Sequence, residues 1–161
     1  MKSIYQTNFS NQKVLIRVDF NVPLNSEKKV TDTSRIVAAK KTIDKITNDG
    51  GTAILMSHLG RPDGNDPDLS LSHIVEAVED VLGKPILFSS QVIGKETLSI
   101  IKDSKPGQVV LLENLRYHKE EEKGDVSFAK ELSFLADSYV NDAFGTAHRA
   151  HASTSVVAGF F

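Results

Sequence analysis

The sequence predicts an α/β fold, a three-layer Rossmann-like domain in which a mainly parallel sheet carries helices on both faces. Two observations favour it. Short runs rich in Val, Ile and Leu, as in strands buried on both faces of a parallel sheet, recur along the 161 residues. Between these runs lie segments with apolar residues at helical spacing. Strand and helix therefore alternate, which favours one sheet with right-handed crossovers.

Five short apolar runs are the expected strands. Each is bounded by turn residues or by a helical pattern. The expected strands are 13–18, 52–57, 85–89, 108–112 and 138–141.

Four helices are expected between the strands. The first has its apolar stripe at positions 36, 39, 43 and 46, with Asp32 or Thr33 as its cap and Gly50 and Gly51 at its end. The second runs between Ser70 and Gly83. The other two are a weaker helix at 94–102 and a clear one after Asp125, with its stripe at 128, 129, 132 and 135.

Length and charge narrow the class of protein. A chain of 161 residues is long enough for one domain that buries roughly 70% of its unfolded surface. The formal charge of −2 argues against a broad basic surface for nucleic acid or anionic lipid, so any positive charge must be focused in a pocket. There is no cysteine, and no apolar stretch approaches the about 18 residues that span a bilayer. We expect a soluble cytoplasmic protein without nucleic-acid or membrane partners.

The arginines indicate that the chain binds a small anion. Arginine recognises phosphate and carboxylate through a fixed, bidentate geometry, whereas lysine is a mobile point charge. All five arginines stand in short motifs at or after an apolar run, while the lysines are scattered. These arginines are Arg17, Arg35, Arg61, Arg116 and Arg149.

Four motifs should meet at one edge of the sheet, because ligands of such sheets bind outside the carboxyl ends of the strands. The motifs follow the first, second, fourth and fifth expected strands, and Arg35 in the first turn of the first helix faces the same edge. They would bring together Asp19, Asn21, His58, Arg61, Arg116 and Arg149.

Structural readings of single motifs remain open at this point. Asp19 to Pro23 is also compatible with an Asx turn, Arg61 with a purely structural turn, and Arg35 with a solvated helix position. The run 119–123 reads most simply as an exposed charged loop.

Other machinery is not indicated by the sequence. His148 and His151 without a matching carboxylate or thiolate are weak evidence for zinc, so no metal site is expected. The sequence contains neither a Gly-x-x-x-x-Gly-Lys-Ser/Thr loop nor a Gly-x-Gly-x-x-Gly motif, which are the common backbone devices for nucleotide phosphates.

The four motifs together carry a family resemblance. They read R-V-D-F-N-V-P at 17–23, S-H-L-G-R-P at 57–62, L-L-E-N-L-R-Y-H at 111–118 and N-D-A-F-G-T-A-H-R-A-H-A-S at 141–153. In order and separation they resemble the amino-terminal half of the phosphoglycerate kinase family. The resemblance runs from about Lys13 to Phe161. Tyr117 stands where phenylalanine is more usual, a change that we expect to be neutral.

The resemblance implies a division of labour between two domains. Residues 1–161 would be a single amino-terminal domain that binds 3-phosphoglycerate or 1,3-bisphosphoglycerate. The carboxyl-terminal domain, absent from this chain, would bind Mg-ATP or Mg-ADP. The two would catalyse reversible phosphoryl transfer between 1,3-bisphosphoglycerate with ADP and 3-phosphoglycerate with ATP, a step of glycolysis. By itself this chain is expected to bind 3-phosphoglycerate without turning it over.

The resemblance also implies roles for site residues. Asp19, Asn21 and Arg35 would hold the carboxylate and hydroxyl end of the substrate, with Arg35 as the catalytic, charge-stabilising group. The phosphate would be held by His58, Arg61, Arg116 and Arg149. Phe20, Leu59 and Gly60 would belong to the same substrate-binding loops, and Arg17, His148 and His151 would extend a basic patch around them.

Two other classes of function compete with this interpretation. The chain would be a stand-alone phosphometabolite-binding regulatory module if its gene ended at Phe161. It would instead be a structural or partner-binding domain if the apolar segment 156–161 mediated self-association without any response to phosphoglycerate.

Overall fold

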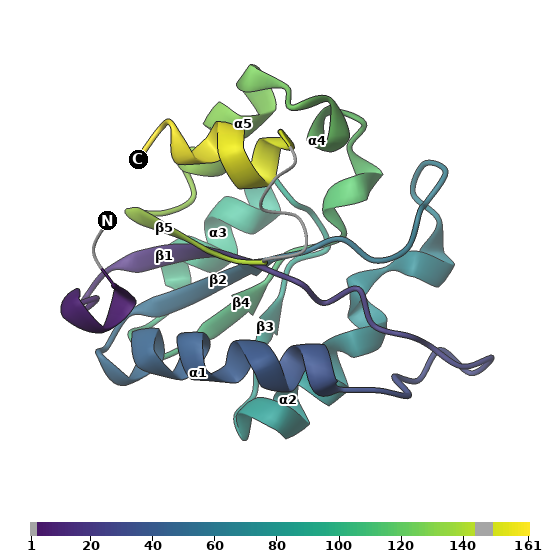
Figure 1. Ribbon diagram of the computed structural model, residues 1–161, viewed down its shortest axis with the longest axis horizontal. Coiled ribbons are helices and arrows are strands. Elements are labelled where there is room, and N and C mark those ends of the chain that lie inside the picture. Colours follow the sequence, from purple (N-terminus) through teal and green to yellow (C-terminus); the bar gives the residue numbers. More distant parts are fainter. Residues whose placement is uncertain (1–2, 144–149) are drawn as a thin grey trace.

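The described chain forms one sheet with helices on both faces. A computed structural model describes residues 3–143 and 150–161 (Figure 1). The strands are β1 (Lys13–Val18), β2 (Thr52–Met56), β3 (Leu87–Phe88), β4 (Val109–Leu111) and β5 (Ser138–Asp142). The α-helices are α1 (Ser34–Asn48), α2 (Val75–Leu82), α3 (Lys95–Asp103), α4 (Glu120–Lys123) and α5 (Val126–Ser133). A π-helical segment, η6 (Ala152–Val156), follows near the carboxyl end.

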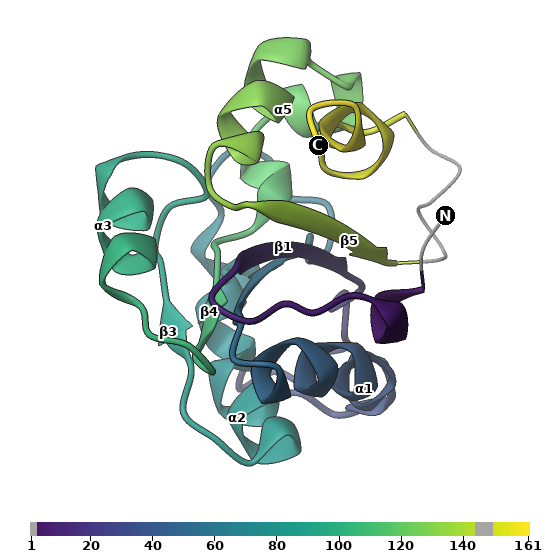
Figure 2. The same cartoon turned by 90° about the vertical axis from the view of Figure 1, so that its left-hand side faces the viewer.

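The sheet has the order β3-β4-β2-β1-β5, and every pair of neighbours is parallel. The predicted three-layer α/β fold and the alternation of strand and helix are confirmed. In Figure 1, α1 and α2 lie below the sheet, and α4, α5 and the carboxyl-terminal segment lie above it. Figure 2 shows the same sheet from its side, with α3 on the β3 side of the molecule.

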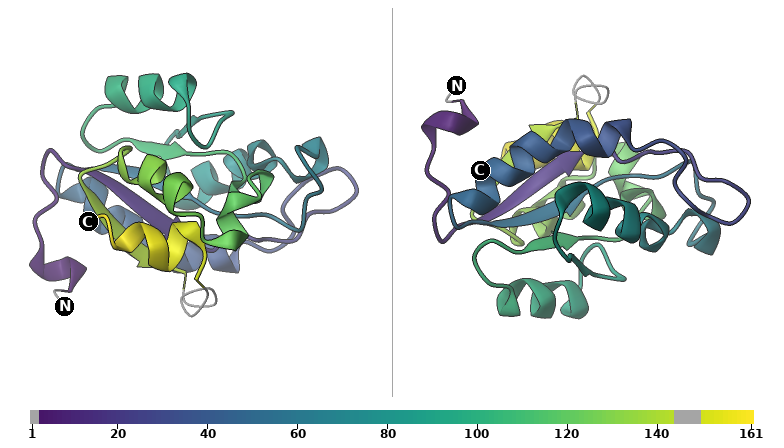
Figure 3. Two further views of the ribbon diagram at one scale, coloured as in Figure 1. Left: turned by 90° about the horizontal axis from the view of Figure 1, so that it is seen from above. Right: turned by 90° about the horizontal axis from the view of Figure 1, so that it is seen from below.

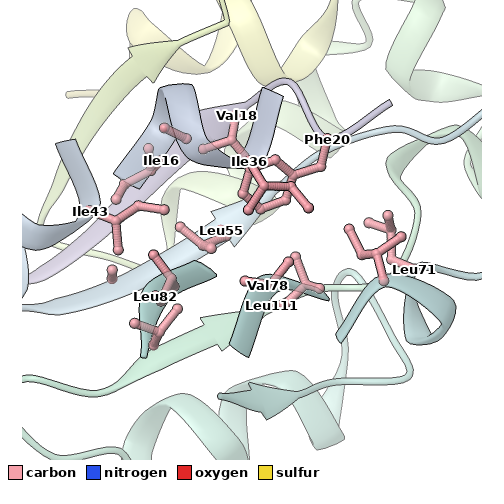
Figure 4. Packing of buried hydrophobic residues seen from close by; sticks show 14 of the residues in the cluster. Ile16, Val18, Phe20, Ile36, Ile43, Leu55, Leu71, Val78, Leu82 and Leu111 are labelled. Atoms are coloured by element: carbon pink, nitrogen blue, oxygen red, sulfur yellow. The ribbon is translucent and has the colours of Figure 1, made fainter. Parts of the chain in front are cut away.

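The two faces of the sheet take alternate residues of each strand, as the period of two requires. Val14, Ile16 and Val18 of β1 pack with α1, α2 and the 3₁₀ turn before α2, a core shown in Figure 4. Leu15 of β1 and Ile54 of β2 point to the other face, where they pack with α3, α5 and η6. Arg17 has the parity of Leu15 and so also lies under this second layer.

Several boundaries differ from those predicted. β3 is only two residues long, and the second helix begins with a 3₁₀ turn at Leu71–Ile74 before α2. Thr33 is the residue before α1, but its side chain makes no capping hydrogen bond; the Asp32 carboxylate instead accepts one from the Ser34 amide at 2.9 Å. Asp125 does cap α5, through the Phe128 amide.

The expectation of an exposed charged loop at 119–123 is wrong in two respects, although the other four side chains of this run are exposed. Residues Glu120–Lys123 form α4, and the side chain of Glu121 is completely buried. The reason is tertiary: Glu121 accepts hydrogen bonds from Ser153 in η6, which lies over α4.

Among residues 3–143 and 150–161, no helix is both long enough and apolar enough to cross a membrane.

Candidate functional site

The loops that follow β1, β2 and β4 leave the sheet on one side. In Figure 1 this side faces right, away from both chain ends, and Figure 3 shows the same loops from above and below. Because all strands are parallel, their carboxyl ends share this edge, as predicted from the sequence. The site has three layers: a rim formed by Arg35, Arg61 and Arg116, the loops that carry it, and the buried side chains beneath.

Arg35, in the first turn of α1, forms one end of the rim. Its Nη1 lies 3.2 Å from Asp19 Oδ1 and donates a hydrogen bond of 2.8 Å to the Asn21 carbonyl. The side chain is 51% exposed, and its other guanidinium nitrogens make no hydrogen bond within the described part of the chain. Asp19 thus fixes the position of Arg35 while leaving most of its five N–H donors directed to solvent or to a ligand.

Asn21 joins the first loop to the second. Its side-chain Oδ1 accepts a hydrogen bond of 2.8 Å from the Gly60 amide. Gly60 has φ +61, and a Cβ there would lie 2.9 Å from a methyl group of Leu69, so this tight approach depends on glycine. Asn21 is therefore a framework residue as well as a candidate ligand.

Arg116 brings the fourth strand's loop to the same place. Its Nη1 lies 3.4 Å from the Gly60 carbonyl, and its Nε lies 3.9 Å from Glu122. Arg61, directly after Gly60, is exposed and makes no hydrogen bond or ion pair with the described residues. Arg35 thus contacts Asn21, Asn21 contacts Gly60, and Gly60 contacts Arg116. This chain of contacts brings three sequence-distant loops together.

Asn114 connects these loops from below, and no separate role was predicted for it. It is fully buried, and its amide group donates to the carbonyls of Leu59 and Leu69 at 2.8 and 2.9 Å. Its Oδ1 accepts from the amides of Leu59 and Arg116. A turn-forming Asn after a buried strand was the available signal, but its partners lie 45 and 55 residues away.

Phe20, Leu59 and Gly60 have framework roles. The side chains of Phe20 and Leu59 are buried in the core. The Phe20 amide donates to Ser57 Oγ, the Leu59 amide to Asn114 and the Gly60 amide to Asn21. Because these amides are already bonded to protein, the three residues shape the loops rather than offer donors to a ligand.

Arg17 does not belong to a surface patch. It is completely buried beneath η6, and its Nη2 lies 2.9 Å from Nδ1 of His58, which is 6% exposed. Burial lowers the pKa of Arg17, and the charge of Glu121 is the largest influence in the opposite direction. The nearby charge of Arg116 also lowers this pKa, so positive charges do gather at this edge.

The remaining candidates follow β5. His151 is buried at the start of η6, while His148 and Arg149 lie outside the described residues. Within the described ranges, no group of three or more His, Cys, Asp or Glu side chains is placed to hold a metal ion.

A hollow of about 350 Å³ beside the rim is not suited to an anion. It is bordered by Asn21 and Gly60, but also by the carboxylates Asp66 and Asp68. Of the described residues that line it, Lys28 is the one cation, and its Nζ lies 3.8 Å from Asp68 Oδ1. The cationic rim rather than this hollow is therefore the candidate site.

Fold and site together define a class: an α/β domain whose loops carry arginines at the carboxyl edge of a parallel sheet, with a nearly buried histidine beneath them. This arrangement is suited to small phosphorylated or carboxylated anions. The phosphoglycerate kinase family model matches residues 4–161. The chain belongs to the phosphoglycerate kinase family.

Similar proteins agree with this assignment. Phosphoglycerate kinase of Chlorobium limicola is 50% identical over 154 residues, covering 95% of this chain and 39% of the relative. That of Porphyromonas gingivalis is 46% identical, covering 99% of this chain and 44% of the relative. The structure of phosphoglycerate kinase from Coxiella burnetii matches with a TM-score of 0.83 at 35% identity, over 96% of this chain and 38% of that one. The chain thus spans roughly two fifths of the length of these relatives.

Proposed function

We propose that this chain is the 3-phosphoglycerate-binding half of a phosphoglycerate kinase, with residues 1–161 forming one amino-terminal domain. The observation that carries the proposal is the contact of three loops at one edge: Arg35 with Asn21, Asn21 with Gly60, and Gly60 with Arg116. The proposal includes a cytoplasmic location, which rests on the cysteine-free composition.

The proposed substrate matches the rim in charge. A phosphorylated three-carbon acid carries one carboxylate and one phosphate, and guanidinium groups bind both in bidentate geometry. We assign the phosphate to His58, Arg61, Arg116 and Arg149. Asp19, Asn21 and Arg35 take the carboxylate and hydroxyl end, where Asp19 accepts a hydrogen bond from the hydroxyl and orients Arg35 at 3.2 Å.

The proposed reaction needs no general base on this chain. In the direction that consumes ATP, the nucleophile is the substrate carboxylate, which is ionised at neutral pH because free carboxyl groups have pKa values of about 3 to 4. Catalysis then consists of in-line positioning and stabilisation of negative charge on the transferred group, and we assign the charge-stabilising role to Arg35. Its half-exposed guanidinium has donors left for that group.

We assign the binding of magnesium nucleotide to a second domain, which corresponds to the part of the relatives that this chain does not cover. The relatives are more than twice as long, and two substrates on separate domains require closure to meet. We therefore propose that the other domain binds Mg-ATP or Mg-ADP and that this chain alone gives negligible turnover. A coupled kinase assay on the purified 161 residues tests this, and full turnover would contradict it.

Binding is tested by calorimetric titration with 3-phosphoglycerate. We expect Arg35→Ala or Arg61→Ala to weaken binding by about 1.5 to 3 kcal/mol, or about 10- to 100-fold. Lys102→Ala removes the same charge from the end of α3, far from the rim, and is the matched control. Equal affinity of all three variants and the parent chain would exclude the proposed site.

A further inference from the structure

Four buried polar side chains lie directly beneath the rim and connect α4 to His58. We name Glu121, Ser153, Arg17 and His58 the buried relay. The first three are completely buried and His58 is 6% exposed. They come from α4, η6, β1 and the loop after β2, so tertiary packing alone brings them together. Such a buried polar network is costly unless each hydrogen bond has a defined donor and acceptor.

The hydrogen bonds at Glu121 and Ser153 have one consistent direction. The Ser153 amide donates to Glu121 Oε1 at 2.8 Å, and the Ser153 hydroxyl donates to Glu121 Oε2. An ionised carboxylate only accepts, so the single hydroxyl proton of Ser153 is committed to Glu121. Its oxygen lone pair is then directed to Arg17, whose Nε donates to it at 2.9 Å.

The same reasoning fixes the proton of His58. Arginine has five N–H donors and no acceptor. Arg17 Nη2 lies 2.9 Å from His58 Nδ1, so Nδ1 must be the accepting, unprotonated nitrogen. A ring that accepts at Nδ1 is neutral and carries its proton on Nε2.

Tyr139 anchors the η6 end of the relay. Its hydroxyl lies 2.8 Å from the Ser153 carbonyl and 3.2 Å from the Thr154 carbonyl. Arg17 Nη1 donates to the Val18 carbonyl, so all three nitrogens of its guanidinium are engaged. Several hydrogen bonds therefore fix the position of Arg17, and Arg17 in turn fixes the orientation of the His58 ring.

We propose that Glu121 and Ser153 are positioning residues: through Arg17 they hold His58 as the neutral tautomer with its proton on Nε2, the form in which that nitrogen is a donor for a phosphate oxygen. This inference rests on the proposed function for the identity of the ligand. The tautomer itself is a property of the chain without ligand, so the two proposals can fail separately.

The first experiment is nitrogen NMR of the imidazole rings in the ligand-free chain at neutral pH, with His58 assigned by comparison with His58→Gln. We expect Nδ1 of His58 to give the shift of an unprotonated nitrogen and Nε2 that of a protonated one. A proton on Nδ1, or a doubly protonated ring, would overturn the proposal. The tautomer is measured on the parent chain, and the variant serves only to assign the signal.

The second experiment changes the relay at a distance from His58. Glu121→Gln keeps the shape of the side chain but removes the charge and supplies a donor where Ser153 needs an acceptor. Without the Ser153 oxygen held as an acceptor, Arg17 should no longer be fixed against Nδ1 of His58. We therefore expect a mixture of His58 tautomers and about tenfold weaker 3-phosphoglycerate binding. Glu121→Asp, which restores the charge, should recover part of both effects.

Glu120→Gln is the matched control, because Glu120 lies on the same helix but is exposed. It should leave the His58 spectrum unchanged.

If Glu121→Gln does not fold, Ser153→Ala provides the same test by removing the bridging hydroxyl. A folded Glu121→Gln or Ser153→Ala with the parent's His58 tautomer would overturn the relay. If the His58 ring shows the expected tautomer in every experiment but the chain does not respond to 3-phosphoglycerate, the proposed function would be contradicted and the relay would not.

Discussion

Arg17 and Arg35 stand only a loop apart in the sequence, yet their surroundings are opposite. Arg17 is completely buried under η6 and uses all three guanidinium nitrogens within the protein. Arg35 is 51% exposed at the rim and uses one nitrogen, for Asp19 and Asn21. Burial closes Arg17 to a ligand, whereas Arg35 has most of its donors available at the surface.

The difference teaches that an arginine-rich motif can contain both the binding group and its support. Arg17 lies on the strand face that α5 and η6 cover, so packing converts it into a framework residue. Arg35 lies in the first turn of α1, beyond the end of the sheet, where its side chain stays 51% exposed. Function therefore follows from which surface of an element a residue occupies.

The largest effect that tests this comparison is on stability. Arg17→Met should lower the free energy of unfolding by about 3 to 5 kcal/mol, because it removes three buried hydrogen bonds and the positive charge that interacts with buried Glu121 across Ser153. Denaturant unfolding measures this effect. Arg61→Met, the same change at the exposed rim, should stay within about 0.5 kcal/mol. Similar losses in the two variants would contradict the distinction between support and binding.

An intermediate effect is expected at Asn114, which supports the loops without carrying charge. Asn114→Ala should cost about 1 to 3 kcal/mol, because it leaves the buried carbonyls of Leu59 and Leu69 without donors. Thermal unfolding checks this, with the exposed Asn65→Ala as control. A stability equal to that of the control would show that Asn114 does not hold the loops.

The smallest effect concerns Asp142, a partly buried acid at the end of β5. Burial raises its pKa, and the hydrogen bond from the Thr42 hydroxyl partly opposes this. Because the folded state holds this proton more tightly than the unfolded state, its contribution to stability is complete below the ordinary aspartate pKa of about 4 and is lost as the pH rises through the raised value.

Asp142→Asn should therefore become progressively more stable than the parent chain from acid to neutral pH, with the difference then levelling off. Melting temperatures across that range measure it, and the exposed Asp63→Asn is the control. A stabilisation that is greatest in acid would show that the sign of the pKa shift is wrong.

Much of the fold was predictable from local patterns. The apolar runs gave the five strands, and the stripe of Ile36, Ile43 and Ile46 gave α1 with its buried face. Strand ends were less predictable, because β3 pairs only through Leu87 and Phe88 with β4. The end of a strand depends on where its neighbour stops pairing with it, and the apolar run of the strand itself does not show this.

The rim was predictable in the same way, since a parallel sheet brings its carboxyl ends together wherever the motifs stand in the chain. The buried relay was not. Ser153 lies 136 residues from Arg17 and 32 from Glu121, and Glu121 sits in a charged run typical of solvent-exposed loops. Arg17 lies two residues after Leu15 and so on the same buried face of the strand, which was a usable signal of its burial. No local sequence pattern indicates that it lies near Glu121.

The most direct test of the central claim, that loops from separate strands form one anion site, is an amide NMR titration of the chain with 3-phosphoglycerate. The account predicts shift changes concentrated at Asp19 to Asn21, Arg35, His58 to Arg61 and Asn114 to Arg116. Changes scattered over α3 and the far side of the sheet, or none at all, would contradict it.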